Sequence, residues 1–319
     1  MTSRTLRFVA GIDGGQSSTS AVVIDERGVV RGRGTAGPAD HVDEPPGSTK
    51  CAAALNAALA GAIVTAGLPR GTLLDAVVAG VSGYDDAFDG APVRLPARAQ
   101  RIVHDAPIAL AGATGERPGA VVIAGTGSVA YGETFGGRSV TLGGYGFLFG
   151  DEGSSFAIAR SAIAGSMRAA DAGQDADLGA AALAFFDVPD LRALARAVSL
   201  HEISRPRLAS FARVVHDAAR LGDEAARAIV DEAADALAAL AVRATDVLEG
   251  NEAAPLPVAF VGGGFANAGF RSTVERRFAA ATANGRVIEA RYEPAVGAAL
   301  FAFDLAELPR PVTVGAPAG

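Results

Sequence analysis

The residues that decide the fold read RFVAGIDGGQSSTSAVVID, from Arg7 to Asp25. Two apolar runs, Arg7–Ile12 and Ser20–Asp25, stand on either side of a turn rich in glycine and hydroxyl residues. A third strand-like segment, Val29–Gly34, follows after another polar turn. Short apolar runs separated by glycine turns are typical of antiparallel strands. The pattern therefore predicts a three-stranded meander at the start of the chain.

The same order of segments begins again near Gly119. Strand-like runs cover Ala120–Ala124, Val129–Glu133 and Arg138–Leu142, and turns of Gly, Ser and Thr separate them. We interpret this second meander as an internal repeat of the first. Since strands and helices alternate after each meander, the chain is predicted to be α/β with duplicated mixed sheets.

The remaining segments are assigned from apolar periodicity and from turn residues. In the first region we expect two strands, two helices and a short helical stretch: Ser48–Ala66 with Ser48 as N-cap, Asp75–Val81, Pro92–Gln100 (helical), Arg101–His104, and a helix from Pro107 onward. The second region should be helical from Ser154 to Gly250, with its best helix at Asp223–Leu248, and should end in Val258–Val261, Gly269–Ala281, Arg286–Glu289 and Pro294–Phe303. We expect an N-terminal lobe, 1–118, and a C-terminal lobe, 119–319, with the last helix, about 294–305, able to pack back on the first lobe.

Three turns could bind a nucleotide because their small residues expose backbone N–H groups to an anion. Taken singly, each is better explained as an ordinary turn in a glycine-rich chain; the occurrence of all three in this order favours a nucleotide site. Asp13 could also hold hydrated Mg²⁺. There is no Gly-Lys-Ser/Thr motif and no strand followed by Gly-x-Gly-x-x-Gly, which excludes a P-loop and a dinucleotide fingerprint. The candidate nucleotide residues are Asp13, Gly14, Gly15, Gln16, Ser17 and Ser18; Gly125, Thr126, Gly127 and Ser128; and Gly262, Gly263, Gly264 and Asn267.

Asp105 is the candidate catalytic base. It follows a strand end and precedes a helix, and phosphoryl transfer needs a carboxylate that accepts the proton of the attacking hydroxyl. An aspartate in this position could equally be the N-cap of the helix. A dense polar cluster, formed by Gly143–Gly146 and Gly150–Ser155, suits the hydroxyls of a sugar, and His41 lies in a loop from which it could reach a substrate.

Composition restricts the remaining possibilities. The 319 residues carry a net charge of −7, and Lys50 is the only lysine, which argues against a nucleic-acid partner. One cysteine, Cys51, cannot form an internal disulfide. No apolar run approaches the length of a membrane span and none reads as a signal peptide, so we expect a cytoplasmic protein without a membrane partner.

Four of these motifs, in this order, resemble the N-acetylglucosamine kinases of the BadF/BadG/BcrA/BcrD ATPase family, within the sugar kinase/Hsp70/actin superfamily. They are Gly11–Gly15, Ala124–Ser128, Gly150–Ser154 and Gly262–Gly264, and the closing Pro294–Leu300 is similar to the last helix of that family. The resemblance implies two actin-like (ribonuclease H-like) lobes that close on ATP, Mg²⁺ and an amino sugar, and commonly a homodimer.

The resemblance also implies roles for single residues. Asp105 matches the base that deprotonates the C6 hydroxyl of the sugar, and Asp151 matches a sugar-hydroxyl ligand. Gly144 and Tyr145 would line the sugar pocket, and Ser17 and Thr126 match phosphate-loop hydroxyls. The reaction implied is phosphorylation of N-acetylglucosamine at C6.

Departures from the family pattern leave alternatives open. Gln16-Ser17-Ser18 lacks the basic residue that relatives often carry, and Tyr145 replaces a frequent Trp. Asp40 aligns with an Asn that contacts the sugar, and a carboxylate there could prefer the free amine of glucosamine. An ATPase activator of a reductase would need more cysteines than Cys51, and a sugar sensor of this fold tends to carry an added helix-turn-helix segment.

Overall fold

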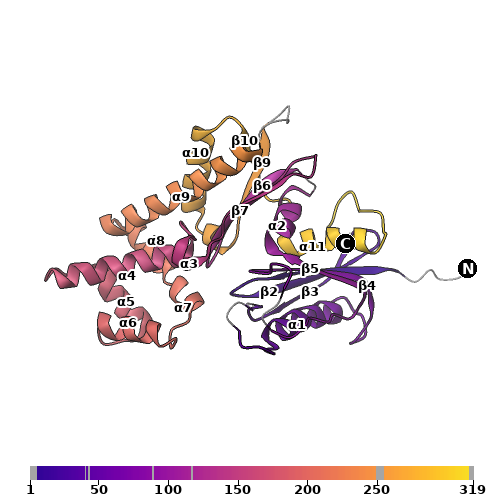
Figure 1. Ribbon diagram of the computed structural model, residues 1–319, viewed down its shortest axis with the longest axis horizontal. Coiled ribbons are helices and arrows are strands. Elements are labelled where there is room, and N and C mark those ends of the chain that lie inside the picture. Colours follow the sequence, from indigo (N-terminus) through magenta and orange to yellow (C-terminus); the bar gives the residue numbers. More distant parts are fainter. Residues whose placement is uncertain are drawn as a thin grey trace, which may run out of the picture. The chain divides into compact units, whose positions relative to one another are not determined.

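The computed structural model describes residues 6–39, 41, 44–87, 90–115, 118–248 and 255–315. The chain forms two compact units (Figure 1). The first combines residues 1–119 with residues 289–319, and the second consists of residues 120–288. Within the described ranges, no helix combines the length and the apolar character that crossing a bilayer requires.

A five-stranded mixed sheet forms the centre of the first unit, in the order β3-β2-β1-β4-β5. The meander pairs antiparallel, whereas β1–β4 and β4–β5 pair in parallel. Successive side chains of a strand point to opposite faces of the sheet, so Val9 of β1 lies on one face and Ala10 on the other. Both faces are therefore apolar and need helices to cover them. The strands are β1 (Phe8–Gly14), β2 (Thr19–Asp25), β3 (Val30–Ala36), β4 (Leu74–Val81) and β5 (Ala97–His104).

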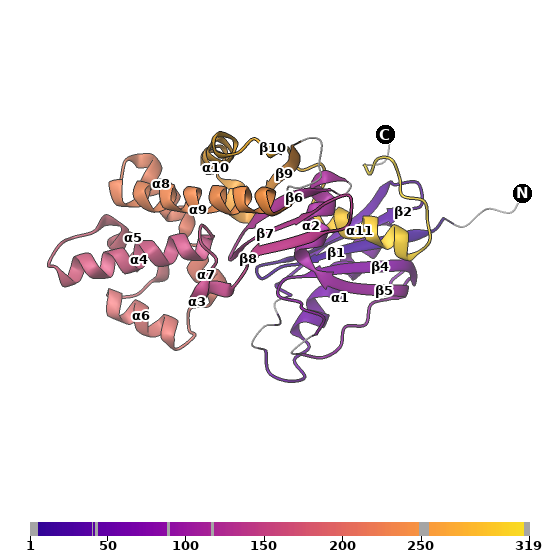
Figure 2. The same cartoon turned by 45° about the horizontal axis from the view of Figure 1, so that its top comes forward.

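Helices cover both faces of this sheet. Helix α1 (Lys50–Thr65) packs on the face that holds Ala10. Helix α11 (Pro294–Leu305) packs on the opposite face, beside α2 (Asp105–Thr114). Figure 2 shows α11, from the end of the chain, lying along the first sheet. The last helix therefore belongs to the same core as the first strand.

The second unit repeats the topology of the first. Its sheet order, β10-β9-β6-β7-β8, places a meander at one side and parallel strands at the other, as in the first sheet. The predicted duplication is thereby confirmed. The strands are β6 (Gly119–Ala124), β7 (Ser128–Glu133), β8 (Ser139–Gly143), β9 (Leu256–Val261) and β10 (Gly285–Val287).

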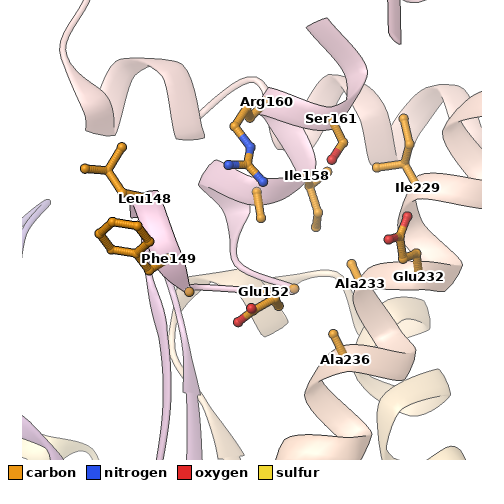
Figure 3. A pocket seen from close by; sticks show the side chains of 13 residues that line it. Leu148, Phe149, Glu152, Ile158, Arg160, Ser161, Ile229, Glu232, Ala233 and Ala236 are labelled. Carbon is orange, nitrogen blue, oxygen red and sulfur yellow. The ribbon is translucent and has the colours of Figure 1, made fainter. Parts of the chain in front are cut away.

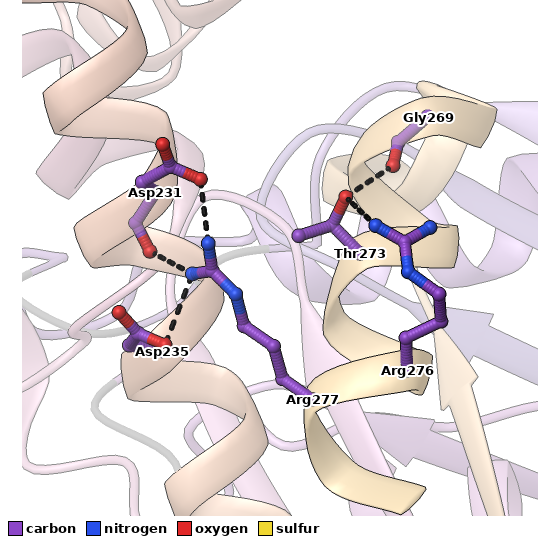
Figure 4. A network of polar contacts seen from close by, with 6 residues as sticks. All are labelled: Asp231, Asp235, Gly269, Thr273, Arg276 and Arg277. Atoms are coloured by element: carbon purple, nitrogen blue, oxygen red, sulfur yellow. Dashed lines mark hydrogen bonds and ion pairs between the residues drawn. The ribbon is translucent and has the colours of Figure 1, made fainter. Parts of the chain in front are cut away.

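The helices of the second unit lie mainly between β8 and β9. The long helix α9 packs on β7, β8 and α10. Arg277 of α10 ties these two helices, because its guanidinium contacts Asp231 at 2.6 Å and Asp235 at 3.0 Å (Figure 4). The helical elements are α3 (Gly146–Phe149), α4 (Ser155–Asp171), α5 (Asp177–Phe186), α6 (Leu191–Ser199), α7 (Arg205–Ala209), α8 (Ala212–Leu221), α9 (Glu224–Leu248), the 3₁₀ turn η1 (Gly263–Ala266) and α10 (Ala268–Ala281).

Two local predictions were wrong. The expected helical stretch Pro92–Gln100 ends instead in β5, which extends the expected strand backward to Ala97. Strand pairing with β4, in register from Leu74↔Ala97 onward, outweighs the helical propensity of alanine, glutamine and arginine there. The N-cap of α1 is Thr49, one residue after the predicted Ser48. The Ser48 hydroxyl donates to Glu44 at 2.8 Å.

Candidate functional site

In the first unit, the ends of parallel strands bring two acidic residues to one edge of the sheet. Asp13 stands near the end of β1, in register with Gly80 of β4, and Asp105 follows the last residue of β5. Carboxyl ends of adjacent parallel strands lie at the same edge, which is where α/β sheets commonly bind ligands. The sequence folds so that two distant carboxylates share this edge.

A third carboxylate joins them. Glu293 immediately precedes α11 and forms an ion pair with Arg33. Burial, followed by the negative charges of Asp105 and Glu293, raises the pKa of Asp13 to about 7. Removing a carboxylate from water and placing like charges near it both disfavour its ionised form. A bound cation would relieve this crowding.

Asp105 is the first residue of α2, and it does not cap the helix. The cap is His104, whose Nδ1 accepts the N–H of Ala106 at 3.1 Å. The same Nδ1 lies 2.9 Å from Asp105 Oδ1. A neutral Nδ1 that accepts from Ala106 has no proton to donate to Asp105, so while His104 is neutral the buried Oδ1 of Asp105 has no hydrogen-bond donor among the described residues.

His104 responds to this neighbour. A hydrogen bond to Asp105 raises the pKa of His104, against the opposing effect of desolvation, and the charges of Asp105 and Asp85 add to the rise. Because a protonated Nδ1 would donate to Asp105, the histidine and the aspartate form one coupled pair at the start of α2.

The first glycine turn follows directly after Asp13. Gly15 N donates to Ser18 O at 3.0 Å, which closes the turn, and Gly15 O accepts from Ala39 N at 3.0 Å. Ser17 and Ser18 are exposed. The turn is therefore braced by its backbone while both hydroxyl residues face outward.

The second glycine turn, Gly125–Ser128, is fastened to the segment that contains Asp151. Ser128 N donates to Asp151 Oδ1 at 3.1 Å, and Ser128 Oγ donates to Glu152 O at 2.8 Å. Ser155 N donates to Gly125 O at 2.9 Å. A Cβ on Gly127 would come within 2.9 Å of both Asp151 carboxylate oxygens, so only glycine allows this approach. Hydrogen bonds thus join the turn Gly125–Ser128 to the loop that contains Asp151 and Glu152.

Asp151 itself is buried and has a positive φ of 62°. Desolvation raises the pKa of its carboxyl, while the bond from Ser128 N and the charge of Arg205 oppose that rise. A positive φ is uncommon for a residue other than glycine and is often found where function requires it.

The third glycine loop, Gly262–Gly264, lies against the end of β6. Strands β6 and β9 pair in parallel, with Ile123 opposite Val261, so the loops after them are neighbours. A Cβ on Gly262 would stand 2.4 Å from Ala124 O. Gly125 and Gly263 have open space where a Cβ would be, which leaves bare backbone on which a ligand could lie. Asn267 caps α10, and its Oδ1 accepts from Phe270 N at 3.0 Å.

The remaining predicted sugar and phosphate residues that the structure describes differ in how exposed they are. Tyr145 is 74% exposed and follows Gly144, whose φ is 70°. His41 is buried, in the first unit. Asp40 lies outside the described residues. Thr126 belongs to the turn before β7.

A pocket of about 270 Å³ adjoins the loop around Asp151 in the second unit. It lies between α4 and α9, and the end of α3 borders it (Figure 3). None of the predicted site residues lines it, although Gly150 and Glu152 stand next to Asp151 in the chain. Its charged side chains are those of Glu152, Arg160 and Glu232.

Sequence reasoning missed Glu293 and the capping role of His104. A glutamate immediately before Pro294, at the start of a predicted helix, is a signal that could have drawn attention to position 293. Nothing in the sequence indicates that the charge of this glutamate acts on Asp13, because the two residues are 280 positions apart in the chain. For His104, only the geometry distinguishes a capping histidine from its neighbour. Across the described residues, no group of three or more His, Cys, Asp or Glu forms a ready metal site.

Comparisons with known proteins agree with this architecture. The model of the BadF/BadG/BcrA/BcrD ATPase family matches residues 10–302. An N-acetyl-D-glucosamine kinase of Dictyostelium discoideum is 27% identical over 311 residues, covering 92% of this chain and 97% of that protein. An N-acetylmuramic acid/N-acetylglucosamine kinase of Clostridium acetobutylicum is 37% identical over 134 residues, and the match spans 42% of this chain and only 44% of that relative.

Solved structures show the same fold. A candidate N-acetylglucosamine kinase from Chromobacterium violaceum has a TM-score of 0.74 at 24% identity, over 92% of this chain and 98% of that one. A glucokinase of the ROK family from Streptomyces griseus, solved with glucose and AMPPNP, has a TM-score of 0.53 at 18% identity, over 94% and 100%. The predicted actin-like fold is confirmed.

Proposed function

Because the chain belongs to the BadF/BadG/BcrA/BcrD ATPase family, we propose that it is an ATP-dependent kinase that phosphorylates the C6 hydroxyl of N-acetylglucosamine. Two relatives whose names include N-acetylglucosamine kinase support the substrate class. The site residues of the two units support the chemistry, and each unit contributes its own groups.

The observation that carries the proposal is the buried Oδ1 of Asp105. While His104 is neutral, this oxygen has no hydrogen-bond donor among the described residues, and a buried polar atom without a partner is costly and often has a functional role. A substrate hydroxyl is a suitable partner, since it would donate to this oxygen and then lose its proton to it. Asp105 is the general base in this mechanism, and proton acceptance of this kind contributes about 10²–10⁴-fold.

The residues present fit MgATP. Burial and the charges of Asp105 and Glu293 disfavour the ionised form of Asp13, which a hydrated cation would favour, and in the second unit the bare backbone at Gly125 and Gly263 leaves space for a ligand. When bound, MgATP supplies the phosphoryl group and neutralises charge on it. Asp13 would hold hydrated Mg²⁺, the turns Gly14–Ser18 and Gly125–Ser128 would donate N–H and O–H groups to phosphate oxygens, and Gly262–Gly264 with Asn267 would receive the adenosine.

The loop from Gly144 to Asp151 would bind the sugar. The Asp151 carboxylate can accept hydrogen bonds from two adjacent hydroxyls when it is ionised, which is the usual way that a carboxylate holds a sugar. Gly144 and Tyr145 would complete this surface. Reading the 2-substituent would fall to side chains such as Asp40 and His41.

A reductase activator is a weaker proposal for this chain. Cys51, its single cysteine, is buried in α1 and is therefore poorly placed to ligate a cluster shared with a partner. We accordingly retain the kinase as the proposed function.

The decisive test is steady-state ADP release with N-acetylglucosamine, glucosamine and N-acetylmannosamine as substrates, for the wild type and for Asp105→Asn. We expect sugar-dependent turnover in the wild type. Asp105→Asn should lower kcat by about 10²–10⁴-fold because the amide cannot accept the proton.

Asp171→Asn is the matched control, since it makes the same chemical change at an exposed residue of α4. It should leave turnover unchanged. Sugar-independent ADP release in the wild type, or full activity in Asp105→Asn, would refute the proposal.

A further inference from the structure

Arg205 lies at the start of α7, over the ring of Phe147 in α3. Its guanidinium carbon is 5.3 Å from the ring centroid, within the range of a cation–π interaction. Phe147 in turn packs edge-on against Phe156 of α4, with ring centroids 5.4 Å apart. A cation and two aromatic rings therefore connect three helices around the loop that contains Asp151.

Helix α7 is firmly held, so the position of Arg205 is fixed. Ser204 caps the helix by accepting from Arg207 N at 3.3 Å. Arg207 stacks over Phe185, 4.3 Å from its centroid, and donates to Phe185 O at 2.9 Å. Leu208 and Ala209 are buried in the core of the second unit. Arg205, the first residue of α7, is therefore attached to a helix whose position is fixed.

By contrast, the segment it contacts has few anchors of its own. No residue of α3 is buried, and Tyr145, Leu148 and Phe149 are each more than 70% exposed. Phe147 is the α3 side chain that packs against the core. A group that holds Phe147 therefore adds a side-chain anchor to α3, beside the hydrogen bonds that join Ser128 to Asp151 and Glu152.

Arg205 also acts on Asp151 through its charge. Burial raises the pKa of Asp151, the nearby charge of Glu152 adds to that rise, and the charge of Arg205 opposes it. A carboxylate that remains ionised can accept two hydroxyl hydrogen bonds, whereas a protonated one loses part of that capacity.

We propose that Arg205 is a positioning residue for sugar binding, which fixes Phe147 with its guanidinium face and whose positive charge favours the ionised carboxylate of Asp151. The inference rests on the proposed function, in which Asp151 binds the sugar. Arg205 itself need not touch the substrate; it acts through Phe147 and Asp151.

The experiment measures N-acetylglucosamine binding by calorimetry between pH 5 and 8, and kcat and KM by ADP release, for Arg205→Met, Arg205→Lys and Phe147→Leu. In Arg205→Met, KM should rise about tenfold with a smaller change in kcat, and the acidic limb of binding should move to higher pH because the positive charge that favours the ionised Asp151 is gone. Arg205→Lys keeps the positive charge, so sugar binding should be lost at the same acidic pH as in the wild type. Phe147→Leu removes the ring and should raise KM without moving that limb.

Arg160→Met is the control, because no described hydrogen bond or ion pair holds that exposed arginine of the neighbouring pocket. It should behave as wild type. An unchanged KM and pH limb in Arg205→Met would overturn the inference while leaving the kinase intact, whereas a wild type that binds no amino sugar would refute the proposed function. Should Arg205→Met melt well below wild type, the folded Arg205→Lys and Phe147→Leu decide: a wild-type KM in Phe147→Leu, or a displaced acidic limb in Arg205→Lys, would also overturn the inference.

Discussion

The pKa of Asp13 lies far above the ordinary value of an aspartate, and the position of the residue explains why. The end of β1, the start of α2 and the residue before α11 meet at one sheet edge, and each contributes a carboxylate. Like charges at close range favour the protonated form of one member. In the proposed kinase, the same arrangement would attract Mg²⁺, so a feature that weakens the metal-free fold would serve the reaction.

Replacing Asp13 by Asn should therefore stabilise the metal-free protein at high pH. The folded-state pKa of about 7 lies above the unfolded value of 3.8, so between these values the folded state binds more protons and stability falls as pH rises. Asp13→Asn removes this loss. Its free energy of unfolding should match wild type near pH 4 and exceed it by a few kcal/mol at pH 8.

Urea unfolding in EDTA at both pH values measures this difference. Asp171→Asn, on exposed α4, should show no such pH-dependent gain. A gain for Asp13→Asn of equal size at pH 4 and pH 8 would contradict the assignment of the raised pKa. The same variant should lose kinase turnover.

Of the site residues, the sequence indicated those that sit in motifs and not those brought in by packing. Asp13 and the glycine turns were visible because a strand followed by small residues has a local signature. The position of Asp105 after β5 was foreseen, but whether it capped α2 could not be decided, because the helix could begin one residue earlier or later and the cap is in fact His104. Glu293 joins the site only through the placement of α11 on β1.

At the level of elements, the close packing of α11 depends on glycine. Gly297 lies where α11 crosses α2, and a Cβ there would stand 2.0 Å from Ile108 O and 2.5 Å from Gly112 N. Gly11 of β1 makes a similar approach to Ala295 O. Such contacts have no room for a methyl group, so backbone would have to move.

Gly297→Ala should consequently destabilise the protein by about 1–3 kcal/mol despite the better helix propensity of alanine. Gly165→Ala, inside α4, is the matched control: the nearest atom to its Cβ would be 3.9 Å away, on a flexible arginine. It should stabilise by up to about 1 kcal/mol. Opposite signs in chemical denaturation would support this account, and equal stabilisation by both would refute it.

Elements were predicted best where apolar periodicity was long. Helix α9 was foreseen to within one residue of its start, because its buried residues recur along one face over 25 positions. Strand β5 was partly missed because its burial alternates weakly and its alanine, arginine and glutamine favour a helix locally. Its identity comes from the parallel pairing with β4, which is a tertiary effect.

On the scale of the whole molecule, the two units differ in how the chain builds them. The second is formed by one continuous segment, residues 120–288, whereas the first needs residues 289–319 to return to it. Without α11, the sheet face that carries Val9, Val22, Ile24 and Val78 would lose most of its apolar cover. Exposed apolar sheet faces promote association and destabilise the fold.

Expressed separately, residues 120–288 should fold cooperatively, whereas residues 1–119 should not. Circular dichroism and thermal unfolding should show a sharp transition for the second unit, and residues 1–119 should bind a hydrophobic dye and aggregate. Joining residues 289–319 to residues 1–119 through a flexible linker should restore a cooperative transition. If residues 1–119 alone were as stable as the joined version, α11 would be dispensable to the first core, and Glu293 would be held near Asp13 by something other than that packing.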